Sequence, residues 1–277
     1  MYKQALDLFG SFRKHYKLGQ TWPAPLCHLE TFIAYLFQNG YAYRTASTYI
    51  SAVRFQHKLL GLSDKLSETI IAKTLEGYRR SKPSADTRLP ITYELLHKLC
   101  LHLKHVCNSL YETQLFKAAF TLAFFGLFRV GELVFSGKAN RQLFLSDLKD
   151  FNACKEFTVY LRQSKTNQCG PPQKIHIVAT GSDTCPVSAM RTYLRVRSTA
   201  SPDCYLFCHH DGSPLTRYQF GAVLRRTMGY IGLAGSHYRS HSFRIGAATW
   251  LARQGVSHSD IKKFGRWSSN SFKHYIR

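Results

Sequence analysis

One stretch near residue 80 divides the sequence and limits the folds that the chain can adopt. Residues 81–90 read Ser-Lys-Pro-Ser-Ala-Asp-Thr-Arg-Leu-Pro, which combines two prolines with small polar side chains and has no hydrophobic periodicity. This composition is typical of an exposed connection. The sequence therefore predicts an N-terminal domain over residues 1–82, a linker over residues 83–90 and a larger domain over residues 91–277.

The N-terminal part has the periodicity of helices alone. Apolar side chains recur at helical spacing in Leu26–Gln38, which Asn39 and Gly40 end, and in Thr45–Leu60, which Gly61 ends. A third helical pattern covers Ser67–Arg80. We therefore expect an all-α domain before the linker.

The larger domain mixes two periodicities. Alternating apolar residues in Phe157–Leu161 and Lys174–Val178 predict two strands, and the turn-rich segment Gln163–Pro172 between them indicates a hairpin. The last 40 residues indicate three short helices. The expected fold class is mainly α with a small antiparallel β-sheet, an α+β domain that follows the all-α domain. Further helices are expected over Tyr93–Val106, Glu112–Phe125, Val187–Arg197 and Thr216–Ile231.

The charge of the chain indicates a polyanionic partner. Lys and Arg number 38 against 16 Asp and Glu, a formal net charge of +22. Such an excess gains most by displacing counterions from phosphates, although a highly soluble basic protein without this partner would have the same charge. The cations of the N-terminal helices that we expect to contact DNA phosphates are Arg44, Arg54, Lys58, Arg79 and Arg80.

Several classes of protein are disfavoured. No window approaches the roughly 18 consecutive apolar residues of a membrane span, and no secretory pattern opens the chain. Eight scattered cysteines lack the spacing of a disulfide framework, which indicates a reducing compartment. One local cluster lacks the second ligand pair of a zinc site, so we interpret it as a strand and turn; it consists of Cys204, Cys208, His209 and His210.

His241 and Arg244 form the first candidate site element. Ser240 can cap a helix in which the two side chains, three residues apart, share a face near the N-terminus. Donor groups beside the positive end of a helix suit a phosphate, although such a pair alone is also common surface polarity.

The other candidates are an ion pair of arginine and glutamate, a lysine and a tyrosine. Arg129 lies in apolar surroundings, and Glu132 is well placed to hold it. Lys165 follows a strand on the expected hairpin connection. Ser257 begins a capping box for a short helix that Gly265 ends, and a last helical turn carries Tyr275. Taken alone, such an ion pair is as often structural as functional, a loop lysine is usually only solvated, and a tyrosine near a terminus is usually structural.

Together these groups suit phosphoryl transfer without metal. Tyr275 is a candidate nucleophile, His241 a proton acceptor, Lys165 a mobile acid, and guanidinium groups can stabilise charge on phosphate oxygens. No Asp/Glu cluster of the two-metal type and no Walker-type loop accompanies them. We therefore expect no metal ion, no ATP and no other cofactor.

The motifs resemble those of the tyrosine recombinases, the phage-integrase-type family. The resemblance rests on Gly126 to Leu133 around Arg129, on Lys165 in a hairpin turn, on His241-x-x-Arg244, and on Gly265 ten residues before Tyr275. The amino-acid sequences of Ser164–Gln168, Asp211–Thr216 and Gly265–Ser269 are similar to those of recombinases of DIRS and Crypton mobile elements. The resemblance covers nearly the whole chain.

The resemblance implies a role for each residue. Tyr275 would attack a DNA phosphate to form a 3′-phosphotyrosine, Arg129 and Arg244 would hold the nonbridging oxygens, and Lys165 would protonate the leaving 5′-oxygen. His241 would act as base or hydrogen-bond the phosphate, and Glu132 would orient Arg129. In place of the family's His or Trp stands Arg266, which could still donate to a phosphate, while the next residue, Trp267, would pack beside it.

The resemblance also implies partners and location. It implies double-stranded DNA, clamped by the two domains, and a homotetramer on synapsed sites that is a monomer or weak dimer when free. Members often extend a C-terminal segment into a neighbour, whereas this chain ends two residues after Tyr275, which implies a fragment or an unusual assembly. An intracellular location follows, nuclear in a eukaryote and in the nucleoid or cytoplasm of a prokaryote.

Three other interpretations stay open at this level. A recombinase-derived DNA-binding protein that no longer cleaves would have the same charge and fold, but the complete set of site residues disfavours it. A type IB topoisomerase-like or telomere-resolving enzyme would share the chemistry without the tetramer. A nucleic-acid packaging protein would explain the charge but not the spaced site residues.

Overall fold

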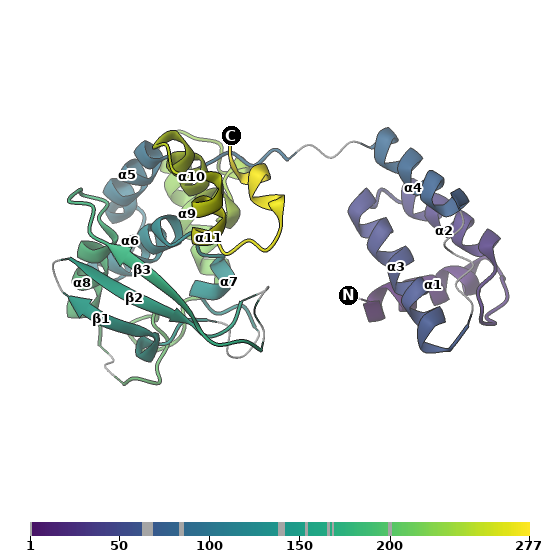
Figure 1. Ribbon diagram of the computed structural model, residues 1–277, viewed down its shortest axis with the longest axis horizontal. Helices are drawn as coiled ribbons and strands as arrows, with labels where there is room; N and C mark the ends of the chain where they lie inside the picture. Colours follow the sequence, from purple (N-terminus) through teal and green to yellow (C-terminus); the bar gives the residue numbers. More distant parts are fainter. Residues whose placement is uncertain are drawn as a thin grey trace. The chain divides into compact units, whose positions relative to one another are not determined.

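The computed structural model describes most of the chain in two units. It covers residues 2–62, 69–82, 86–137, 142–152, 155–164, 167, 169–198 and 201–277, with the side chains of residues 151 and 152 excepted. The units are Met1–Asp86 and Thr87–Arg277, so the division falls inside the stretch expected to be a linker. Figure 1 shows helices alone in the first unit and helices with a sheet in the second. The expected fold class is confirmed.

The first unit is a bundle around one aromatic core. Phe9 and Phe12 of the first helix pack with Phe32 of the second, with ring centroids 5.0 and 5.1 Å from Phe32. The first helix was not predicted, because Gly10 weakens its sequence pattern and no capping residue precedes it; its apolar face becomes evident only from the partners that it covers. The helices are α1 (Tyr2–His15), α2 (Leu26–Gln38), α3 (Tyr43–Leu59) and α4 (Thr69–Ser81).

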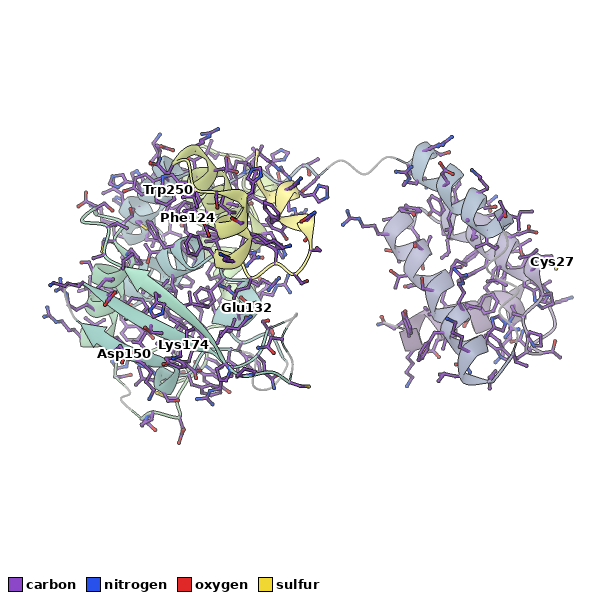
Figure 2. The ribbon with its side chains drawn as sticks, in the orientation of Figure 1. Cys27, Phe124, Glu132, Asp150, Lys174 and Trp250 are labelled. Carbon is purple, nitrogen blue, oxygen red and sulfur yellow. The ribbon has the colours of Figure 1, made fainter. Side chains whose placement is uncertain are left out.

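The second unit is organised around α6 (Leu110–Phe125), which is buried on nearly every side. Figure 2 shows Phe124 of this helix near Trp250 of α10, and their ring centroids lie 6.1 Å apart. Because α6 contacts α8 and α10, it forms the centre of the core. The other α-helices are α5 (Tyr93–His102), α7 (Val130–Leu133), α8 (Pro186–Val196), α9 (Arg217–Tyr230), α10 (Ser240–Arg253) and α11 (His258–Phe264). Short 3-10 turns are η2 (Leu103–His105), η3 (Leu145–Asp147), η4 (Gly235–His237) and η5 (Asn270–Tyr275).

The sheet has three antiparallel strands in the order β1-β2-β3. The predicted hairpin is present as β2 (Glu156–Leu161) and β3 (Gln173–Val178), with Phe157 paired with Ile177 and Val159 with Ile175. The additional strand β1 (Leu148–Asn152) was not predicted, since it is short, carries Lys149 and Asp150, and has an irregular register. In Figure 1 the end of β2 and the start of β3 lie at the same end of the sheet as α7.

Several predicted boundaries differ from the structure, most of them by one or two residues. The helix expected over Tyr93–Val106 ends at His102 and continues as the 3-10 turn η2. The helix at His241 is capped by Arg239 and not by Ser240, because the hydroxyl of Ser242 accepts the hydrogen bond from the Arg239 backbone N–H at 3.0 Å. The last 40 residues form three helical segments as predicted, but α10 has 14 residues and η5 is a 3-10 helix.

The first residues of the second unit pack against the rest of that unit. The backbone N–H of Leu89 donates to the His237 carbonyl at 3.0 Å, and that of Ile91 donates to the Ser242 carbonyl at 3.0 Å. A Cβ atom on Gly246 would lie 1.7 Å from the Ile91 carbonyl oxygen, so glycine is required for this approach. Residues 89–91 thus lie along the beginning of α10, next to His241. No helix in the described ranges is long and apolar enough to cross a membrane.

Candidate active site

A cleft of about 560 Å³ brings together segments that are distant in the sequence. It lies where α7, the end of β2, the first turns of α9 and α10, and η5 meet. Five of the predicted site residues line it: Arg129, Glu132, His241, Trp267 and Tyr275. The other lining residues are Val130, Gly131, Ser136, Gln163, Ser164, Arg217, Ser268, Ser269 and Ser271.

Arg129 is positioned by the tight connection between α6 and α7. Leu127 adopts a left-handed conformation with φ 46°, and a Cβ atom on Gly126 would lie 2.2 Å from the Phe128 ring. Arg129 then caps α7, and Glu132 holds it twice: one carboxylate oxygen accepts from Nη1 at 2.8 Å and the other from the backbone N–H at 2.9 Å. The predicted ion pair is therefore present, and the Glu132 side chain is 5% exposed.

Arg244 lies beneath the cleft and is 1% exposed. Its Nη2 donates to the Gly265 carbonyl at 2.9 Å, and its Nη1 donates to the Leu127 carbonyl. The guanidinium carbon is 4.3 Å from the Trp267 ring centroid. Burial, and then the positive charges of Arg129 and Arg266, lower the pKa of Arg244 to about 9. The guanidinium stays charged at neutral pH and contributes positive charge to a site that suits an anion.

Arg266, like Arg244, has contacts that differ from the expected contact with a phosphate, since neither side chain lines the cleft. Its side chain is 6% exposed, and its guanidinium faces inward rather than into the cleft. The Nη2 atom pairs with Glu132 Oε2 at 3.2 Å, and Nη1 donates to the Gly126 carbonyl at 3.0 Å. This arrangement does not provide a direct donation from Arg266 to a phosphate in the cleft, because both Nη atoms are directed at protein acceptors and the side chain is buried.

Trp267 forms a wall of the cleft. A Cβ atom on Gly265 would lie 1.6 Å from the Trp267 ring, so the ring occupies space that only glycine leaves open. The ring centroid is 5.1 Å from that of Tyr275. Trp267 thereby packs between the Arg244 guanidinium and the tyrosine.

His241 lines the cleft one turn before Arg244. Burial lowers its pKa to about 4, and the positive charges of Arg88, Arg244 and Arg217 contribute in the same direction. The imidazole is therefore neutral at neutral pH and has a ring nitrogen able to accept a proton.

Tyr275 is half-buried at the end of η5 and lines the cleft. Its backbone is held by Thr249 of α10, whose hydroxyl donates to the Tyr275 carbonyl at 3.2 Å and accepts from the Arg277 backbone N–H at 3.1 Å. The preceding helix begins as predicted, since the Ser257 hydroxyl accepts from the Asp260 N–H at 3.1 Å.

Lys165 lies outside the described residues. The residues before it, Gln163 and Ser164, line the cleft. Ser164 is joined to Asn167 by backbone hydrogen bonds, with the Ser164 N–H donating to the Asn167 carbonyl at 2.8 Å. The segment that carries the predicted general acid therefore begins at the cleft.

Arg217 is a site residue that the sequence analysis missed. It is exposed at the first turn of α9 and lines the cleft. A bridge between Phe135 and Thr216, with the Arg217 N–H bonded to the Phe135 carbonyl at 2.9 Å, holds it beside the Arg129 segment. The capping box of Thr216 and Gln219 marks the helix start in the sequence, but nothing there indicates that this start faces Arg129.

The predicted DNA-contacting cations lie on two helices of the first unit. Arg44, Arg54 and Lys58 belong to α3, and Arg79 and Arg80 to the last turns of α4. Arg44, Lys58 and the α4 pair are exposed. Arg80 pairs with Glu76 at 2.5 Å on the same helix, which offsets part of its charge.

The described residues contain no group of three or more His, Cys, Asp or Glu side chains that could hold a metal ion. The Cys204 to His210 segment has structural contacts instead. Cys208 forms a β-bridge with Pro214, and the Cys204 sulfur accepts from Arg197 Nη2 at 2.7 Å. This agrees with the interpretation of the segment as a strand and turn.

Comparison with known proteins identifies the class. A model of the phage integrase family matches residues 94–277, more than half of the chain. The match and the fold together define a site-specific DNA recombinase of the tyrosine class. The chain belongs to the phage integrase family. A search of curated protein sequences found no match.

Solved structures agree with this fold at low sequence identity. The Tn1549 transposon integrase in complex with circular intermediate DNA has a TM-score of 0.69 and 14% identity, covering 99% of this chain and 87% of that one. XerH recombinase bound to palindromic difH substrate has a TM-score of 0.65 and 16% identity, covering 98% of this chain and 72% of that one. A lambda integrase dimer bound to a COC′ core site has a TM-score of 0.58 and 17% identity, covering 99% of this chain and 71% of that one. The finer resemblance to DIRS and Crypton recombinases stays a prediction.

Proposed function

We propose that the chain cleaves and rejoins double-stranded DNA through a 3′-phosphotyrosine on Tyr275, without metal or ATP. The observation that carries this proposal is one cleft that holds Tyr275, Arg129 and His241 above the buried guanidinium of Arg244. These are the groups that an in-line attack on a phosphodiester requires: a nucleophile, a proton acceptor and fixed cations.

In the first step the Tyr275 hydroxyl oxygen bonds to the DNA phosphorus, and the bond from phosphorus to the 5′-oxygen breaks. The Tyr275 proton passes to the neutral His241 imidazole, and the 5′-oxygen takes up a proton, for which we propose Lys165 as donor. Rejoining reverses these transfers when a 5′-hydroxyl attacks the phosphotyrosine. The phosphodiester energy is kept in the covalent bond, so no ATP is needed.

The cations stabilise the charge that develops on the nonbridging oxygens. Arg129 has a 20% exposed side chain at the cleft and can present N–H groups to a phosphate while Glu132 fixes its orientation. Arg217, at the first turn of α9, adds an exposed cation to the cleft. With fixed guanidinium groups around the phosphate, the charge stabilisation that other phosphoryl-transfer enzymes obtain from metal ions is supplied by the protein.

The wider setting belongs to the same proposal. The +22 charge, the exposed cations of α3 and α4, and the DNA-bound recombinases that share the fold support a duplex DNA partner. We further propose a homotetramer on synapsed sites, a monomer or weak dimer without DNA, an origin in a mobile element, and an intracellular location that is nuclear in a eukaryote.

A nicked suicide duplex tests the proposal. Duplexes that tile the DNA on both sides of the gene are nicked near each candidate site, so that cleavage releases a short strand and traps the adduct. The wild-type protein is expected to form an adduct that resists denaturation without added metal and in the presence of a chelator. Tyr275→Phe should bind the same duplexes without forming it. DNA binding without an adduct from wild type would indicate a non-cleaving DNA-binding protein, and an equal adduct from Tyr275→Phe would reject Tyr275 as the nucleophile.

A further inference from the structure

Arg266 is a buried cation whose acceptors all belong to the protein. Its guanidinium donates to the carbonyl oxygens of Gly126 at 3.0 Å, Leu127 at 3.1 Å and Phe264 at 3.1 Å, besides its pair with Glu132. Two of these carbonyls belong to the connection that carries Arg129. A guanidinium presents its N–H groups as a rigid planar fork, so this set of contacts fixes several groups at once.

Two acceptors of Arg266 are shared with Arg129 and Arg244. Glu132 Oε2 accepts from Arg266 Nη2 at 3.2 Å and also from the Arg129 backbone N–H at 2.9 Å. The Leu127 carbonyl accepts from Arg266 and also from Arg244. Arg266 is thereby joined to both arginines through one intermediate group each.

The charge balance points in the same direction. Arg129 and Glu132 alone would form a neutral pair, which would attract a phosphate weakly. Burial raises the pKa of Glu132, but the charges of Arg266 and then Arg129 outweigh it and lower the pKa. Glu132 is thus shared by two guanidinium groups, and the three groups together keep a net positive charge next to the cleft.

The backbone at Arg266 is also unusual. Arg266 has φ 56° and Leu127 has φ 46°, left-handed conformations that residues other than glycine adopt infrequently. Glycine would fit position 266 with less backbone cost, so the presence of arginine there indicates a role for the side chain.

We propose that Arg266 is a positioning residue for DNA cleavage, which balances Glu132 and holds Arg129 and Arg244 in place without contacting DNA. The inference rests on the proposed function. In this proposal Arg266 supports the guanidinium groups of Arg129 and Arg244, and Trp267 lines the cleft next to it.

The test compares Arg266→Met, Glu132→Gln and the double variant on the trapped duplex. A small displacement of catalytic groups can cost about 100-fold in rate, so we expect Arg266→Met to slow single-turnover adduct formation by about this factor. If Arg266 acts through Glu132, the double variant should be slowed little more than the slower single variant, because the two changes affect one unit.

The salt dependence of DNA binding separates positioning from phosphate contact. A cation that neutralises one phosphate contributes about 0.9 to the log–log slope of affinity against salt. Arg266→Met should keep the wild-type slope, whereas the matched control Arg217→Met, which removes an exposed cation of the same cleft, should lower it. Thermal unfolding without DNA measures the Glu132 link independently: the double variant should lose less Tm than the two single losses added.

Three results would overturn the inference: a slope for Arg266→Met that falls as in Arg217→Met, rate losses that multiply in the double variant, or Tm losses that add. Absence of any adduct from wild type in this assay would instead reject the proposed function, and the Tm comparison would still decide whether Arg266 and Glu132 act as one unit. If Arg266→Met does not fold, Arg266→Lys provides the same comparisons, since lysine keeps the charge but lacks the planar fork.

Discussion

The guanidinium carbon of Arg244 lies 5.6 Å from the ring centroid of Tyr275, the tyrosine that we propose as nucleophile. The same guanidinium is 4.3 Å from the Trp267 ring centroid, so two aromatic rings cover it. A cation at this distance from an aromatic face is attracted to it. In the structure without DNA, the buried arginine therefore also holds the nucleophile and its neighbour in place.

Replacing Arg244 by lysine should abolish most cleavage while the protein still binds DNA. The ammonium cannot donate to the Gly265 and Leu127 carbonyls in the planar arrangement of the guanidinium. Because the guanidinium packs against Trp267 and Tyr275, its loss should misplace the nucleophile, and a small misplacement can cost about 100-fold, measured as the single-turnover rate of adduct formation. Arg253→Lys, an exposed change in the last turn of the same helix, is the matched control and should leave the rate unchanged. Equal rates for wild type and Arg244→Lys would contradict the assignment.

The hydroxyl of Thr249 should contribute both to the free energy of unfolding and to the rate of adduct formation. Thr249→Val keeps the shape but removes the bonds to the Tyr275 carbonyl and the Arg277 N–H, so it should lower the free energy of unfolding by about 1 kcal/mol. It should also slow adduct formation, because the backbone of Tyr275 loses its attachment to α10. Thr249→Ser keeps the hydroxyl and should retain more of both quantities than valine. If serine and valine behave alike, the hydroxyl has no role in holding Tyr275.

His241 should titrate far below an ordinary histidine. Its pKa is lowered from 6.5 to about 4, so NMR of the protein without DNA should show a neutral imidazole near pH 5.5. The unfolded chain binds this proton at higher pH than the folded chain does. The contribution to stability is therefore complete above pH 6.5 and is lost as the pH falls from 6.5 towards 4. His241→Gln should lose less stability than wild type over this range, and a midpoint near 6.5 for His241 would contradict its burial among cations.

Gly265→Ala should disturb the cleft wall. The new methyl group would lie 1.6 Å from the Trp267 ring, and overpacking of this kind costs about 1–3 kcal/mol. We expect a lower free energy of unfolding by denaturant and a slower adduct reaction, since the displaced ring contacts Arg244 and Tyr275. Gly229→Ala, where a Cβ atom meets nothing within 4 Å, is the control and should not destabilise the protein. Unchanged stability of Gly265→Ala would show that the ring can move away freely.

Much of the fold was accessible from local patterns. The spacing of apolar residues predicted α2 with its observed ends, and the capping box at Ser257 predicted the start of α11. Both signals arise from bonds and contacts within a few residues, which the sequence displays directly. Strand β1 and helix α1 were missed because their local signals are weak, and packing against distant partners stabilises them.

The sequence by itself determined which chemical groups the site contains: Tyr275, His241, Arg129, Arg244 and the carboxylate of Glu132. Only the tertiary structure decided how they are used. It placed Arg217 in the cleft, put Trp267 against Arg244, and turned Arg266 inward to Glu132, 134 residues away along the chain. The physical reason is that a buried guanidinium is directed by its acceptors, and here those are carbonyl and carboxylate oxygens that folding brings together from separate segments.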